Sequence, residues 1–243
     1  IEFAMLDNKF ILQLAYPQSF DFNTTPNLVV SVKDSALRRA LPYQNIQKQT
    51  THGFFSYNYK GDLLFNPTVS DTIYHILTDS TFTAKYFVKH KKSIWQLYKE
   101  NLIHGEISQK IKNDGYSRFG HFFYETEKNI HFSISFSSEQ QNYILSHHYW
   151  YDKESKKTYA KGTISHREQN VISNFFLGTV GAWGNYYIAE ISPETIETFR
   201  EHYHRTKGTK DSLYFKNEEL RKIIEIKDDP NQALVLYKLD FNK

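Results

Sequence analysis

Ile73-Tyr74-His75-Ile76-Leu77-Thr78-Asp79 is an apolar run that ends at an Asp, and a second run resumes at residues 83–88. An Asp side chain hydrogen-bonds its own backbone in a tight turn, so this order of residues predicts a β-hairpin. The same pattern recurs at 28–34, which returns at 37–43, and at 148–152, which returns at 157–164. We therefore expect a chain built largely from antiparallel hairpins.

The spacing of these hairpins favours a β-propeller. Asp34 and Asp79 lie 45 positions apart, a usual length for one four-stranded blade. Asp152 follows 73 positions after Asp79, which leaves room for a helical insertion between two blades. The sequence therefore predicts an all-β fold that is a propeller or part of one.

The composition is that of a globular protein rich in strands. The chain has 243 residues, of which 40% are hydrophobic and 23% charged, enough to bury one large core or two small ones. Aromatic residues reach 16%, with 18 Tyr and 19 Phe. Phe and Tyr suit pleated, half-buried strands, which agrees with the hairpin pattern.

Charge and residue usage exclude several classes of protein. The net charge is +3 without a long basic run, which argues against a nucleic-acid partner. The absence of Cys excludes disulfides, Cys-type zinc sites and thiol nucleophiles. No apolar stretch approaches the roughly 18 residues that a membrane span needs. The chain starts at Ile1 without an initiator Met, which indicates a processed or truncated product.

Residue periodicity predicts the remaining elements. In residues 130–136 apolar and polar side chains alternate, which predicts a strand with two distinct faces. Helical spacing replaces this alternation at 93–111, with Ser93 as the N-cap. Pro193 follows Ser192 at the start of a second helix that we expect to end near His204. Further strands are predicted at 10–16, 53–59, 63–66, 120–125, 142–151, 186–191 and 233–239, a long loop at 162–181, and a short helix at 217–226.

The number of predicted strands limits the number of blades. We count 13 to 15 strands, whereas six four-stranded blades need about 24. The chain is therefore expected to supply three to four blades. We predict one propeller domain over residues 1–243, incomplete at its N-terminus and part of a six-bladed ring.

Four segments carry a resemblance to a known family. They are Asp71-Thr72-Ile73-Tyr74-His75-Ile76 with 85–88, Tyr124-Glu125-Thr126 with 130–132, residues 151–157, and residues 229–239. In this order they resemble the six-bladed β-propeller lipoproteins of Bacteroidetes, over roughly residues 50–243. The resemblance implies that this chain is the C-terminal part of such a ring.

The resemblance also implies a location. Members of that family are exported and lipid-anchored through an N-terminal Cys, which this chain lacks. A periplasmic or cell-surface protein is therefore implied, with contact to a membrane only through an anchor outside this sequence. The family often has an acidic, Gly-rich loop after the hairpin that corresponds to residues 148–164 of this chain. Residues 165–170 are more basic and lack the glycines, so a ligand role of that loop is not carried over.

Motifs for catalysis and for metal or cofactor binding are absent. No His-Glu-x-x-His, Gly-x-Ser-x-Gly or phosphate-binding glycine loop occurs, so we predict no metal and no cofactor. The glycines at 178–184 are expected to form a tight loop between strands. A glycosidase needs two carboxylates. The available candidates are Asp152, Glu154, Glu168 and Glu190.

Sugar binding has better support from the sequence. Flat aromatic rings stack on pyranose rings, and in a propeller such residues gather on loops at one mouth of the central channel. The candidate ligand-binding residues are His148, Tyr149, Trp150, Arg167, Trp183 and Tyr186. The alternative is that Trp150 and Trp183 pack between blades.

The sequence therefore favours a non-enzymatic exported protein that binds glycans or peptides or serves as a scaffold. Two alternatives stay open. One is a propeller enzyme that acts on polysaccharide as a hydrolase or lyase. The other is an assembly module whose exposed blade edges pair with a partner chain.

Overall fold

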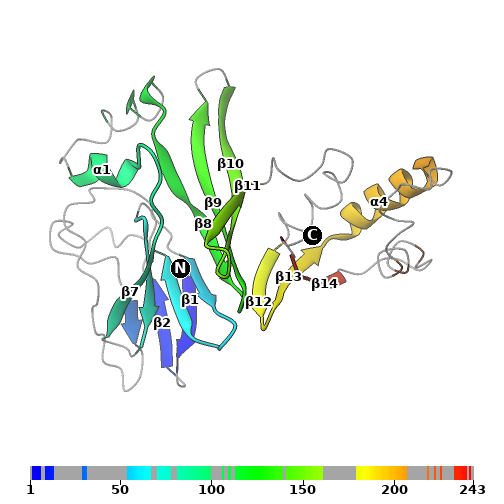
Figure 1. Cartoon of the computed structure of the whole chain (residues 1–243), viewed down its shortest axis with the longest axis horizontal. Coiled ribbons are helices and arrows are strands. Elements are labelled where there is room, and N and C mark those ends of the chain that lie inside the picture. The colour runs from blue at the N-terminus through cyan, green and yellow to red at the C-terminus, as the bar shows by residue number, and fades with distance from the viewer. Residues whose placement is uncertain are drawn as a thin grey trace. The chain divides into compact units, whose positions relative to one another are not determined.

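In a computed structural model of the chain, the described residues form fourteen strands in four antiparallel sheets (Figure 1). The structure describes residues 2–6, 9–13, 29–31, 54–66, 70–77, 81–99, 106, 109–110, 113–138, 141–160, 179–206, 218, 222, 225, 233–239 and 241. Two sheets have three strands and two have four. The predicted all-β propeller architecture is confirmed, and four sheets agree with the three to four blades expected.

The chain divides into two compact units, Ile1–Tyr159 and Ala160–Lys243. The expectation of one domain over residues 1–243 stays a prediction. The first unit holds three sheets, and in each of them strands adjacent in sequence pair with one another. Its sheets are β1 (Glu2–Leu6), β2 (Lys9–Gln13) and β3 (Val29–Ser31); β4 (Phe54–Tyr57), β5 (Leu63–Asn66), β6 (Thr72–Ile76) and β7 (Phe82–Phe87); and β8 (Ser117–Glu125), β9 (Asn129–Ser138), β10 (Gln141–Asp152) and β11 (Lys157–Ala160).

Two of the Asp-led hairpins lie within the described residues as paired strands. β6 pairs antiparallel with β7, although Asp79 itself lies outside the described residues. In the β10–β11 turn, Asp152 accepts hydrogen bonds from the backbone N–H groups of Glu154 at 3.4 Å and Ser155 at 3.1 Å. Of the first hairpin only β3 is described, so its turn and return strand lie outside the described residues.

The main hydrophobic core of the first unit involves side chains of the β4–β7 and β8–β11 sheets. Buried residues from both sheets form one cluster, which includes Leu64, Ile73, Phe119, Phe123, Ile130, Phe132 and Ile134. Asn66 Nδ2 on β5 donates a hydrogen bond to the Gly120 carbonyl on β8 at 3.0 Å. Neighbouring sheets therefore pack face to face, as propeller blades do.

The predicted alternation of β9 is confirmed, and both faces of the strand are buried. Ile130, Phe132 and Ile134 lie in the hydrophobic cluster, while His131 and the serines between them are buried on the opposite face. On this polar face the hydroxyls of Ser135 on β9 and Ser146 on β10 lie 2.9 Å apart and form a hydrogen bond. Helix α1 (Ile94–Lys99) begins as predicted, since Trp95 N–H donates to Ser93 Oγ at 3.1 Å.

The second unit is a three-stranded sheet with one helix. It contains β12 (Thr179–Trp183), β13 (Tyr186–Ile191), α4 (Pro193–Thr206) and β14 (Ala233–Tyr237), in the strand order β12-β13-β14. Helix α4 begins at Pro193 as predicted, and Thr195 N–H donates to Ser192 Oγ at 3.3 Å. Most of the predicted helix at 217–226 lies outside the described residues.

The sequence predicts a long loop that ends at residue 181 and a tight loop at 178–184. Both predictions are wrong for residues 179–183, which form β12. This strand pairs with β13 through a register shift between Thr179 and Gly181, which accommodates glycine in an edge strand. The turn itself is only Gly184-Asn185. Gly184 has a φ of 54°, the positive value that the first central position of a type II′ hairpin turn requires.

Within the described residues, no helix combines the length and the apolar character that crossing a membrane requires.

Candidate functional site

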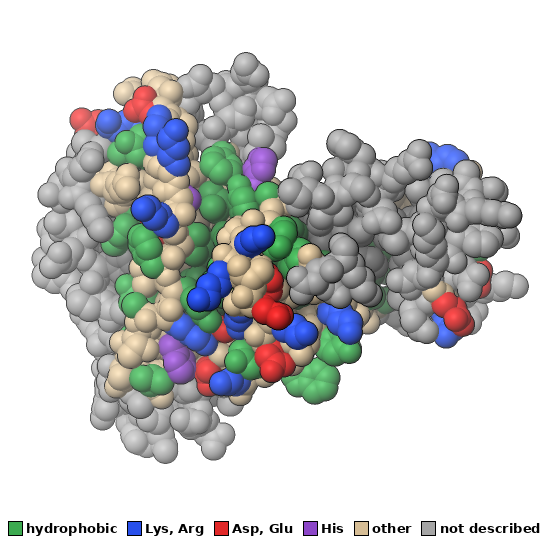
Figure 2. Space-filling model, in the orientation of Figure 1, with side chains coloured by type: hydrophobic (Ala, Val, Ile, Leu, Met, Phe, Trp, Pro, Cys, Tyr) green, Lys and Arg blue, Asp and Glu red, His purple; other side chains and the backbone are tan. Residues whose placement is uncertain are grey.

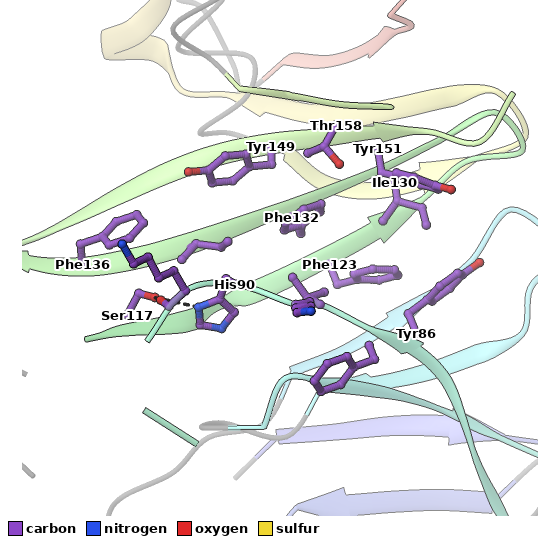
Figure 3. A pocket seen from close by; sticks show the side chains of 15 residues that line it. Tyr86, His90, Ser117, Phe123, Ile130, Phe132, Phe136, Tyr149, Tyr151 and Thr158 are labelled. Atoms are coloured by element: carbon purple, nitrogen blue, oxygen red, sulfur yellow. Dashed lines mark hydrogen bonds between the residues drawn. The ribbon is translucent and has the colours of Figure 1, made fainter. Parts of the chain in front are cut away.

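The first unit contains an open groove of about 740 Å³ (Figure 3). One wall of the groove is a face of the β8–β11 sheet. The other wall is formed by residues 86–91, which are the last two residues of β7 and the four residues that follow it. Ten of its fifteen lining residues are apolar or aromatic. They are Tyr86, Phe87, Val88, Phe123, Ile130, Phe132, Ile134, Phe136, Tyr149 and Tyr151.

Strand alternation builds the sheet wall of the groove. Residues two apart on β9 point to the same face, so Ile130, Phe132, Ile134 and Phe136 form one apolar row. Tyr149 on β10 stacks against Phe132, with ring centroids 5.6 Å apart and planes 18° apart. The wall is therefore a packed apolar surface rich in aromatic rings.

One end of the groove carries a chain of three polar side chains. His90 Nδ1 lies 2.7 Å from Ser117 Oγ (Figure 3). His90 Nε2 lies 2.9 Å from Asp71 Oδ1. Ser117 Oγ also donates to the Lys91 carbonyl at 3.1 Å.

This Ser-His-Asp order resembles a nucleophile activated by a base, but its burial limits what it can do. Ser117 is only 1% exposed and its hydroxyl is bonded on two sides. The arrangement therefore fixes the segment after β7 against the first residue of β8. Sequence reasoning missed this contact, and the only signal was Asp71 at the start of a blade motif, since Ser, His and Asp are too frequent for a triad to be chosen.

The charged lining of the groove is entirely basic. Lys89 and Lys91 are exposed residues on either side of His90, and none of the fifteen lining residues is Asp or Glu. Within the described part of the chain, neither lysine has a carboxylate partner.

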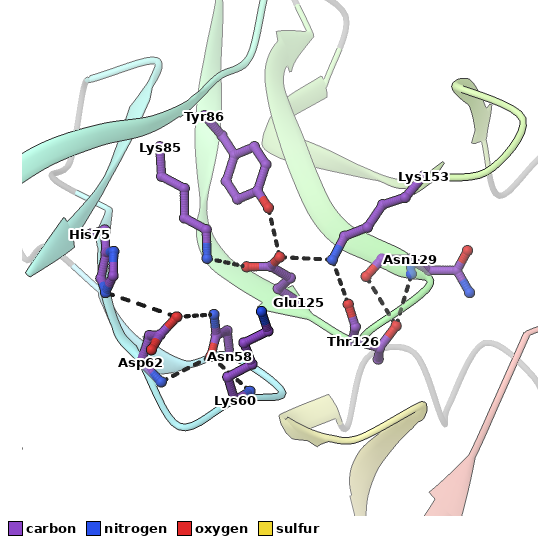
Figure 4. A network of polar contacts seen from close by, with 10 residues as sticks. All are labelled: Asn58, Lys60, Asp62, His75, Lys85, Tyr86, Glu125, Thr126, Asn129 and Lys153. Atoms are coloured by element: carbon purple, nitrogen blue, oxygen red, sulfur yellow. Dashed lines mark hydrogen bonds and ion pairs between the residues drawn. The ribbon is translucent and has the colours of Figure 1, made fainter.

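A buried carboxylate lies beside the groove. Glu125 accepts hydrogen bonds from Lys153 at 2.7 Å, Tyr86 at 2.6 Å and Lys85 at 3.0 Å (Figure 4). Burial acts to raise the pKa of Glu125, but these three donors outweigh it and the pKa is lowered. Burial, followed by the bond to Glu125, raises the pKa of Tyr86, so this groove-lining phenol stays a neutral donor.

The candidate residues predicted on β10 lie on two different faces. Tyr149 lines the groove, whereas His148 and Trp150 are buried on the opposite face. His148 Nδ1 lies 3.0 Å from His131 Nε2, and the Trp150 ring stacks on His131 with centroids 4.6 Å apart. Burial, together with the neighbouring His148, lowers the pKa of His131 well below its usual value.

The remaining candidates belong to the second unit or lie outside the described residues. Trp183 and Tyr186 face each other across the β12–β13 hairpin and are 67% and 39% exposed. Arg167 and Glu168 lie outside the described residues. Of the other carboxylates, Asp152 caps its own turn, Glu154 is exposed in that turn, and Glu190 lies on β13. The ligand-binding set as a whole stays a prediction.

No group of three or more His, Asp or Glu side chains suited to a metal ion occurs in the described ranges.

Comparisons with known proteins agree with the blade-like sheets. A family model described as "6-bladed beta-propeller" matches residues 10–190. Among solved structures, that of a candidate exported protein from Bacteroides fragilis NCTC 9343 is similar, with a TM-score of 0.55 and 12% identity. The match covers 96% of this chain and 63% of that one, so this chain spans less than two thirds of its length. At this identity the likeness shows the fold alone. No curated protein matches.

Proposed function

The chain belongs to the 6-bladed beta-propeller family, and from this premise we propose that it is an exported, non-enzymatic binding protein whose ligand occupies the groove of the first unit. The candidate exported protein of Bacteroides fragilis shares the fold. This similarity supports the periplasm or cell surface as the location of the present chain. A scaffold role is compatible with the fold but has no specific contact to support it.

The observation that carries this proposal is the open apolar groove. Ligand pockets in proteins usually have volumes of roughly 300–1,000 Å³ and are lined mainly by hydrophobic and aromatic side chains with a few polar groups. The groove matches this description with about 740 Å³ and ten apolar or aromatic lining residues.

The chemistry of the lining favours an apolar ligand over a glycan. The His90 and Ser117 side chains bond each other, so they offer little to a sugar hydroxyl. A buried hydroxyl without a partner costs about 1–3 kcal/mol. Hydrophobic side chains of a peptide, or a small apolar molecule, carry no such cost. The glycosidase alternative needs two carboxylates at the site, and the lining contains none.

Binding of a neutral apolar dye, Nile red, tests the proposal. Thr158 is an exposed groove residue on β11, and we expect Thr158→Trp to fill the groove and weaken binding at least fivefold. Thr83→Trp is the matched control, because Thr83 is exposed on β7 and does not line the groove. Equal binding by both variants, or no binding by the unmodified protein, would contradict a ligand in this groove.

A further inference from the structure

We propose that the groove selects an amphipathic anion, with an apolar body along the β8–β11 wall and one anionic head group beside residues 89–91. This inference rests on the proposed function and names the class of ligand for the same site. Carboxylate and phosphate heads share the required chemistry.

The groove has distinct ends. Figure 3 places His90 and Ser117 near Phe136 at one end, and Tyr86, Ile130 and Tyr151 toward the other. The polar contacts of His90 therefore mark one end, while aromatic and aliphatic side chains continue to the other. A ligand that matches both ends has one polar head and one apolar body.

The sign of the charge decides which head fits. Lys89 and Lys91 line the groove without a carboxylate partner among the described residues, and no acidic side chain lines it. On the face drawn in Figure 2, hydrophobic side chains lie among both basic and acidic ones, so the preference rests on the groove lining alone. Charge attraction is stronger beside an apolar wall than in bulk water, so an anionic head gains and a cationic head is repelled.

The backbone that carries the two lysines is held in place. Val88 N–H donates to the Asp71 carbonyl at 2.8 Å, and Ser117 N–H donates to the Lys92 carbonyl at 2.8 Å. Between them His90 bridges Asp71 and Ser117. A segment that is already ordered loses less conformational freedom when it binds, which favours this site over a free lysine pair on the surface.

Displacement of Nile red by three ten-carbon compounds tests the inference, each used below its micelle concentration. Decanoate, decanol and decylamine share the apolar body and differ in the charge of the head. We expect decanoate to displace the dye at an about five- to tenfold lower concentration than decanol, and decylamine to be the weakest. The advantage of decanoate should shrink between 20 mM and 500 mM salt, because salt screens exposed charges. Decyl phosphate separates a phosphate head from a carboxylate head.

The variant Lys89→Gln/Lys91→Gln should remove the advantage of decanoate and leave displacement by decanol unchanged. The matched control is Lys128→Gln/Lys157→Gln, which removes two exposed lysines that do not line the groove. An advantage that survives in the first variant, or that the control also loses, would overturn the inference.

The outcomes separate the two proposals. If decanol displaces Nile red as well as decanoate does, the anion preference is wrong and binding in the groove stands. If decanoate displaces Nile red better than decanol does and loses this advantage only with the groove lysines, both proposals stand. If neither dye nor decanoate binds, both proposals fall.

Discussion

At the scale of single residues, Glu125 shows how a buried charge is accommodated. Its carboxylate is nearly inaccessible, and three donors converge on it, two from β7 and one from the β10–β11 turn. Burying a carboxylate without such partners would cost several kcal/mol. The network thus connects Lys85 and Tyr86 on β7 with the end of β8 and the β10–β11 turn, which carries Lys153.

We predict that Glu125→Gln lowers the free energy of unfolding at pH 7 by about 2 kcal/mol, because an amide accepts fewer and weaker hydrogen bonds from two lysines. The pKa of Glu125 is lowered in the folded protein relative to its ordinary value of 4.5. Its contribution is therefore present above about pH 4.5 and is lost as the pH falls through the lower folded pKa. Urea unfolding from pH 7 to pH 3 should show a smaller acid loss in the variant.

Glu154→Gln is the control for this experiment, because Glu154 is an exposed residue of the neighbouring turn. An unchanged acid profile in Glu125→Gln, or the same change in Glu154→Gln, would contradict the role given to the buried carboxylate.

At the scale of elements, Gly120 sets the distance between β8 and β9. A Cβ at this position would overlap Ser133 Oγ and lie 2.8 Å from the Ser133 carbonyl oxygen. The β8–β9 pairing shifts register between Phe119 and Phe123, at the point where Gly120 lies. Only glycine permits this close approach of the two backbones.

We predict that Gly120→Ala lowers the free energy of unfolding by about 2 kcal/mol, because the strands must move apart within a packed core. Gly181→Ala is the control, since a Cβ there meets only Ile188 Cδ1 at an ordinary 3.7 Å. Chemical denaturation should separate the two variants. Adding Ser133→Gly to Gly120→Ala should recover part of the loss, because it removes the side-chain overlap but not the backbone contact.

The β10–β11 turn offers a stabilising change. Lys156 has a φ of 56°, in the left-handed region that is unfavourable for residues other than glycine. We predict that Lys156→Gly raises the free energy of unfolding by about 0.5–1 kcal/mol. Lys157→Gly, one residue later in β11, should lower it by a similar amount, since glycine weakens a strand. Thermal and urea unfolding of both variants measures these changes. If both variants are stabilised, or both are destabilised, the strain assigned to Lys156 is wrong.

Elements with strong local signals were predictable and those with weak signals were not. The caps at Ser93 and Ser192 and the alternation along β9 follow from the nearest residues, so the sequence located them. β12 was missed because Gly-rich strands lack alternation and depend on pairing with β13. The groove was missed for a related reason. It combines residues 86–91 with strands far along the chain, and the burial that separates Tyr149 from Trp150 appears only when the sheets pack.

At the scale of the whole molecule, blades were predictable from the sequence because each blade is a local meander of strands adjacent in sequence. Blade packing requires each sheet to cover the face of its neighbour. Among the described residues of the second unit, one face of the β12–β13–β14 sheet carries exposed apolar side chains. Strand register places Trp183 and Tyr186 on this face together with Leu234 and Leu236, which are 71% and 52% exposed.

We predict that the exposed apolar face of the β12–β13–β14 sheet causes the 243-residue chain to self-associate as the protein concentration rises, because exposed apolar patches drive association. Leu234→Thr/Leu236→Thr should shift the protein toward monomer in sedimentation velocity. Its stability should change little, since both side chains are already exposed. Leu77→Thr, at an exposed position in the first unit, should leave association unchanged. A chain that stays monomeric at every concentration would contradict this prediction and mean that the exposed leucines are tolerated in water.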